Sequence, residues 1–221
     1  MDYTFQFLPV AYIWILSILA VLPLLLIATR VDWIKIRQRG VLNVWLICIL
    51  LLAIVWMIRA GAGEDFHIHL LGAMLFALMF GWQLGVLGVA AVSLLICLWG
   101  NMLPQNLPLA IIFYALFAVS FSYLVFLLIE YLLPHNLYIY LYVSAFFGSA
   151  LAYCLAGTLS ALPFWLFDVH SWSTLINEYL PFVYLMSFAE SFLTCGLLTV
   201  FVVYRPEWVF SFRDERYLQD K

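Results

Sequence analysis

The chain lacks the charge that a soluble protein needs. Only 10% of its 221 residues are Asp, Glu, Lys or Arg, whereas a soluble domain carries about 25%. Hydrophobic residues make up 67% of the chain. They form apolar runs nearly from end to end, as membrane-spanning helices require. The composition therefore excludes a soluble fold and predicts an all-α, multi-pass integral membrane protein.

The sequence motifs of hydrolytic and nucleotide-using proteins are also missing. We find no glycine-rich phosphate loop, no nucleotide-binding motif and no HExxH zinc motif. The chain is therefore not expected to be an enzyme, to bind nucleic acid or to hold a permanent cofactor. Transport against a gradient would have to be driven by a partner or by a coupled ion.

A cleavable signal peptide is not expected either. The start Met1-Asp2-Tyr3-Thr4-Phe5 carries no basic residue, and no small-residue cleavage site follows the first apolar run. We predict one transmembrane domain over residues 1–221, ending in a short cytoplasmic tail at 205–221. The predicted spans are about 9–29, 41–58, 67–80, 83–99, 109–132, 138–162 and 182–204.

The third and fourth spans come from the longest uncharged run, Leu70–Gly100. At ~1.5 Å per residue this run would be ~46 Å long as a helix, which is too long for one ~30 Å crossing. We therefore expect two helices that join near Gly81-Trp82. The first of them is short or broken, which is tolerated where a segment lines a cavity enclosed by protein.

The distribution of basic residues supports an odd number of spans. Of nine Lys and Arg residues, four lie in Arg30–Arg39 and four in Arg205–Lys221. Positive residues collect on the cytoplasmic side of a membrane. Seven spans put both groups there, with the N-terminus outside and the C-terminus cytoplasmic. The outer side then receives Glu64–His69, Asn101–Asn106 and Asp168–Glu178, which would favour cations over anions.

The stretch Glu64–Gly81 opens with two acids, Glu64 and Asp65, and two histidines, His67 and His69. Imidazole suits divalent transition metals, and the carboxylates could add oxygen ligands. In a helix the two rings would point apart, whereas in an extended stretch both could bind one ion. The alternative is a polar helix start at the membrane interface, with the acids near the helix dipole.

Three further polar residues are candidates for a cavity lining, namely Asn101, Glu190 and Thr194. Glu190 lies near the middle of the last span, where an ionisable group suggests function. Ser187 and Thr194 share its helix face. The alternative for Glu190 is a hydrogen-bonded carboxyl that pins helices together. Asn101 belongs to a proline-rich turn, and its amide either orients a ligand or caps a helix.

Two stretches resemble a known family of metal transporters. His69-Leu70-Leu71-Gly72, with Gly81 after eight further residues, resembles a segment of the CbiM/NikM-type permeases. Glu190-Ser191-Phe192-Leu193-Thr194, with Arg205-Pro206-Glu207 at the membrane exit, is similar to their closing helix. Leu98-Trp99-Gly100-Asn101-Met102 looks like their glycine- and asparagine-containing turn. The resemblance covers roughly Gly63–Trp208.

This resemblance implies a substrate-capture subunit of an energy-coupling-factor transporter for cobalt or nickel. Such a subunit would lie in the bacterial inner membrane beside ATPase subunits and a transmembrane coupling subunit. His69 matches the family's metal-binding histidine, whereas His67 has no clear counterpart. The family's best-known members begin Met-His-Ile-Pro, and that histidine and the amino terminus supply ligands. Here the chain begins Met1-Asp2-Tyr3-Thr4.

The missing N-terminal histidine leaves three alternatives. His67, Glu64 and Asp65 complete a different metal site with His69, or the substrate differs, or this branch no longer transports metal. We expect the first, with a divalent transition metal of the nickel or cobalt class as substrate. The rival is a membrane interaction or assembly protein that keeps the fold and has lost the metal site.

Overall fold

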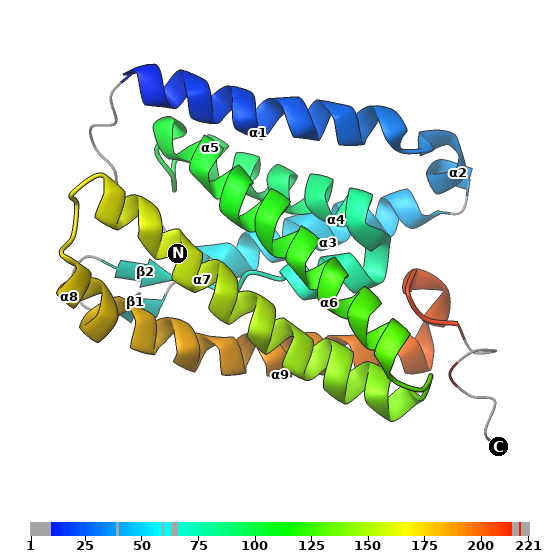
Figure 1. The fold of residues 1–221 in the computed structure, drawn as a ribbon. Coiled ribbons are helices and arrows are strands. Elements are labelled where there is room, and N and C mark those ends of the chain that lie inside the picture. The colour runs from blue at the N-terminus through cyan, green and yellow to red at the C-terminus, as the bar shows by residue number, and fades with distance from the viewer. Residues whose placement is uncertain (1–9, 39, 59, 63–65, 214–216, 218–221) are drawn as a thin grey trace.

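The computed structural model describes residues 10–38, 40–58, 60–62, 66–213 and 217. Over these residues the chain forms a bundle of helices with one small hairpin (Figure 1). The helices are α1 (Val10–Arg30), α2 (Trp33–Gln38), α3 (Val41–Met57), α4 (Ala73–Leu98), α5 (Leu107–Ala110), α6 (Val119–Leu132), α7 (Gly148–Leu166), α8 (Trp172–Thr174) and α9 (Leu180–Tyr204). The π-helical stretches Ile111–Ala118, Ile139–Phe147 and Leu175–Tyr179 continue into α6, α7 and α9, and 3₁₀ turns lie at Pro104–Asn106 and Pro206–Trp208. Strands β1 (Ala60–Ala62) and β2 (Phe66–Ile68) pair antiparallel.

Long apolar helices make the protein a multi-pass membrane protein. Five helical runs among the described residues are long and apolar enough to cross a bilayer. They are Tyr12–Arg30, Ala73–Leu98, Pro104–Leu132, Ile139–Leu166 and Trp172–Tyr204. The apolar helix α3 has 17 residues and reaches ~25 Å. The expected α-helical membrane fold is confirmed at this level.

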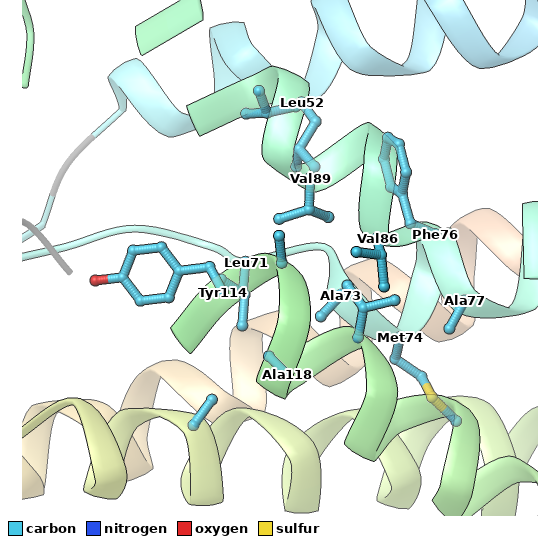
Figure 2. Close-up of a cluster of buried hydrophobic side chains, with 14 of the residues drawn as sticks. Leu52, Leu71, Ala73, Met74, Phe76, Ala77, Val86, Val89, Tyr114 and Ala118 are labelled. Carbon is cyan, nitrogen blue, oxygen red and sulfur yellow. The ribbon is translucent and has the colours of Figure 1, made fainter. Parts of the chain in front are cut away.

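Helix α4 is broken at Gly81, where the sequence predicted a join between two helices. Gly81 has φ 78° and ψ 176°, a conformation open to glycine and not to residues with a side chain. A Cβ placed on Gly85 would lie 3.3 Å from the backbone of Phe76, although nine helical residues should separate them by ~13 Å. The chain therefore folds back at Gly81. Figure 2 shows the result, with Phe76 in one buried cluster with Val86 and Val89.

The first half of α4 begins at Ala73, six residues later than the predicted start at His67. Residues 69–72, which precede the helix, are not helical, and Gly72 among them has φ 71°. His67 lies in β2, where its Cα faces that of Gly61. The delayed start has a physical cause in α9, since the Glu190 carboxylate accepts hydrogen bonds from the backbone of Leu71 and Gly72. Those amides are then held outside the helix.

The loop predicted after residue 162 is shorter than expected. Helix α7 continues to Leu166 with Pro163 inside it, and α8 begins at Trp172. Proline is tolerated in membrane helices where neighbouring groups satisfy the backbone that it frees. Only residues 167–171 separate the two helical runs.

The connections gather at the two ends of the bundle. At one end Tyr12 packs edge-on against Phe167, and the β-hairpin and α8 lie at that end as well (Figure 1). At the other end a hollow of about 820 Å³ is lined by Gly40, Gly81 and Pro206, among others. The α1–α3 connection, the break in α4 and the segment after α9 therefore share one end.

The segment after α9 caps the broken end of the short helix. The amides of Phe210 and Ser211 donate to the carbonyls of Met79 and Leu78, at 2.9 and 3.1 Å. The Ser211 hydroxyl also donates to Leu78 O at 2.8 Å. A helix end leaves carbonyl groups without helical partners. The break at Gly81 is thus compensated by backbone from 130 residues further along the chain.

Candidate metal centre

His69 lies in the non-helical segment 69–72 between β2 and α4, with its side chain buried to 2% exposure. Its ring centroid is 4.3 Å from that of Trp56 on α3, at an interplanar angle of 34°. Tyr114, from the π-helical stretch Ile111–Ala118, meets the ring edge-on at 5.8 Å. Aromatic side chains of two different elements therefore fix the plane of the imidazole.

The hydrogen bond of His69 decides which ring nitrogen can bind a cation. Its Nδ1 lies 2.9 Å from the carbonyl oxygen of Leu70. A carbonyl only accepts, so Nδ1 carries the proton and donates. In the neutral ring the lone pair then resides on Nε2. Histidines that ligate metals generally donate their other ring N–H to a carbonyl or carboxylate in this way.

The backbone from His69 to Gly72 is held by side chains from three helices. The Tyr153 hydroxyl on α7 donates to His69 O at 2.8 Å, and the Trp56 indole makes a longer 3.4 Å bond to Leu71 O. On α9 the two oxygens of Glu190 accept from Leu71 N at 2.8 Å and Gly72 N at 2.7 Å. Segment 69–72 is therefore irregular backbone in which His69 O and the N–H groups of Leu71 and Gly72 find partners inside the bundle, as the membrane interior demands.

Glu190 fits the alternative of a hydrogen-bonded carboxyl that pins elements together. It is buried to 2% exposure, and its partners are backbone amides. Ser187 and Ser191 beside it donate to carbonyls of their own helix, Tyr184 O and Ser187 O. Thr194, one turn further along α9, is buried. The predicted polar face of α9 exists, and its carboxylate, Glu190, accepts hydrogen bonds from the segment that carries His69.

The remaining predicted residues are located as follows. Glu64 and Asp65 lie outside the described residues, and so does the side chain of His67, whose backbone is in β2. Asn101 is half-buried in the turn after α4, where its backbone N–H donates to Ile96 O. Within the described part of the chain no three His, Cys, Asp or Glu side chains are grouped as a metal site. The four predicted ligands thus stay a prediction.

Sequence reasoning missed the residues that surround His69. Trp56, Tyr114 and Tyr153 are not among the candidate residues that the sequence predicted. A usable signal was the position of Tyr114 and Tyr153 inside apolar runs, because a buried tyrosine hydroxyl generally needs a hydrogen-bond partner. The sequence could not tell which carbonyl would be that partner.

Comparison with protein families gives a match over most of the chain. A family described as the cobalt uptake substrate-specific transmembrane region, CbiM, matches residues 5–208. The chain belongs to this family. The CbiM match extends the sequence resemblance, which began near Gly63, to the first predicted span. The family is a transporter component and not an enzyme family. No curated protein and no solved structure matched in the corresponding searches.

Proposed function

We propose that this CbiM-family protein captures a divalent transition metal of the cobalt or nickel class at the outer end of the bundle. The observation that carries the proposal is the buried imidazole of His69. Its ring plane is fixed by Trp56 and Tyr114, and its tautomer by Leu70 O. Such a ring presents a neutral nitrogen donor, which is the form that binds metal. His69 is the principal ligand in this proposal.

Glu64, Asp65 and His67 are proposed as the assisting groups. Phe66–Ile68 is a strand and His69 follows it directly, outside any helix. In extended backbone, side chains at i and i+2 share a face. This backbone favours the alternative in which His67 and His69 serve one ion. The two acids lie two and three positions before His67 in the sequence and would attract cations to the same end of the bundle.

We further propose seven crossings, with the N-terminus outside and the C-terminus cytoplasmic, in a bacterial inner membrane. The third crossing would be made by the non-helical residues 69–72 together with Ala73–Phe80, which is ~12 Å long as a helix. The third crossing is supported by the position of Gly81, which lies at the same end of the bundle as Gly40 and Pro206. Most of the basic residues belong to the chain near that end, as the cytoplasmic side requires.

Inward transfer would be driven by separate ATPase subunits through a transmembrane coupling subunit, since the chain carries no nucleotide motif of its own. Uptake of radioactive cobalt by cells is expected only when those subunits are expressed together with this protein. Uptake by this chain alone would contradict the proposed energising partners.

Metal content of the purified protein tests the capture step. Wild-type protein should retain nickel, cobalt, copper or zinc above the level of a His67→Ala/His69→Ala double variant. His135→Ala is the matched control, because His135 lies at the other end of the bundle, 3.4 Å from Glu130. Equal metal content in wild type and the double variant would refute metal capture and favour the rival, a family member without a metal site.

A further inference from the structure

We propose that Glu190 is the positioning residue for the metal ligand His69. It lies on α9, 121 positions after His69 in the sequence, and would not touch the ion. It acts through the backbone of Leu71 and Gly72, which it holds by two hydrogen bonds. The inference rests on the proposed function, because it assigns a role within the same metal centre.

The grip of Glu190 on this segment uses both of its carboxylate oxygens. Oε2 accepts from Leu71 N at 2.8 Å and Oε1 from Gly72 N at 2.7 Å. Hydrogen bonds to an ionised acceptor are shorter and roughly twice as strong as neutral ones. Two hydrogen bonds to consecutive amides also fix the orientation of the backbone, whereas a single hydrogen bond would let the backbone rotate about it. The carboxylate stands just before the first turn of α4, where the helix dipole favours negative charge.

The opposite side of the segment is held as well. Tyr153 donates to His69 O and Trp56 to Leu71 O, so the backbone is fixed between donors on α7 and α3 and an acceptor on α9. The bilayer interior contains no water that could replace a lost hydrogen-bond partner. If Glu190 lost its charge, the segment would have to move to find other acceptors for its amides.

A shift of the segment would be transmitted to the imidazole. Leu71 is only two residues from His69 along the chain, so a displacement of its backbone is carried to the Cα of His69. The His69 ring is confined by Trp56 and Tyr114, so it cannot compensate by free rotation. Binding sites need their groups within ~0.5 Å of the productive geometry. Changes to groups that orient a metal ligand typically weaken metal affinity by about 10- to 100-fold.

The experiment compares cobalt binding by purified protein and by Glu190→Gln, Glu190→Asp, His69→Ala and Glu207→Gln variants. Glu207→Gln is the matched control, because Glu207 is exposed and pairs only loosely with Arg205 at 3.4 Å. In Glu190→Gln the side-chain oxygen can accept a hydrogen bond from one backbone N–H. The side-chain NH₂ group would face the other backbone N–H, and two donors cannot bond to each other. The dissociation constant for Co²⁺ should rise about 10- to 100-fold, and Glu190→Asp should lie between it and wild type.

Two readouts separate positioning from a merely structural role. Cobalt bound at saturation should stay at the wild-type stoichiometry in Glu190→Gln, while its visible absorption spectrum changes because the ligand geometry is altered. A structural defect would instead lower the stoichiometry and leave the affinity and spectrum of the remaining sites unchanged. Hydrogen exchange in the metal-free protein should be faster at Leu71 and Gly72 in Glu190→Gln but unchanged in Glu207→Gln.

Each outcome decides the inference. Wild-type affinity in both Glu190 variants, with binding lost in His69→Ala, would overturn the positioning role and leave the proposed function intact. Absence of cobalt binding by wild-type protein would overturn both. Should Glu190→Gln not fold, Glu190→Asp decides alone, since it keeps the charge and shortens the side chain by one methylene. Wild-type affinity and spectrum in that variant would overturn the role.

Discussion

Replacing Gly81 by alanine should destabilise the protein by about 1–3 kcal/mol. The residue has φ 78° and ψ 176°, in a region that side chains make costly by about that amount. An added Cβ would also lie 3.1 and 3.2 Å from two ring carbons of Phe210. Phe210 is exposed, so its ring can move aside, and the backbone conformation accounts for most of the expected loss.

Two other glycines separate the contributions to this loss. Gly100 has φ 76°, and an added Cβ there would meet no atom within 4 Å. Gly100→Ala should therefore cost only the ~1–2 kcal/mol of a left-handed backbone. Gly196 lies within α9 and is equally open. Gly196→Ala should stabilise the protein by up to about 1 kcal/mol, because alanine favours helix over glycine.

Unfolding by SDS in mixed micelles would rank the three variants. The midpoint should be lowest for Gly81→Ala and highest for Gly196→Ala. A Gly81→Ala midpoint equal to that of Gly196→Ala would mean that α4 runs straight through this position. The folded-back arrangement in Figure 2 would then be wrong, and with it the argument that residues 69–80 connect the two ends of the bundle.

Two further changes test packing and capping. Gly88→Ala should destabilise the protein by about 1–3 kcal/mol from overpacking. The added Cβ would lie 2.7 Å from the Phe76 ring and 3.0 Å from Trp45 Nε1. The same SDS titration measures this loss, and an unchanged midpoint would contradict the close approach of the two halves of α4. Ser211→Ala should cost about 1–3 kcal/mol, because it removes the hydroxyl bond to Leu78 O and takes the Ser211 partner from the buried Tyr140 hydroxyl. An unchanged midpoint would contradict these hydroxyl contacts.

Much of the fold follows from local features of the sequence. The uncharged run Leu70–Gly100 was too long for one crossing, and Gly81 offered the conformation needed for a break. The start of the short helix could not be derived in this way. It depends on Glu190, which lies more than a hundred residues downstream, and no local pattern announces that contact. Helix continuation through Pro163 likewise depends on packing in three dimensions.

The candidate metal centre was predicted in part. The residue types pointed to the stretch Glu64–His69, the family resemblance singled out His69 within it, and the apolar context singled out Glu190. Their relation was not predictable, because a buried carboxylate can bind a cation, another side chain or backbone amides with equal chemical sense. The structure shows the last of these. The aromatic neighbours of His69 come from α3 and the π-helical stretch before α6, whose alignment only the packed bundle fixes.

The central claim is that His69 ligates the transported metal, and X-ray absorption at the cobalt edge tests it most directly. Cobalt-loaded wild-type protein should show the scattering pattern of imidazole nitrogen. In His69→Ala that contribution should fall together with the bound cobalt, while His135→Ala should match wild type. An imidazole signal of equal strength in wild type and His69→Ala would contradict the claim.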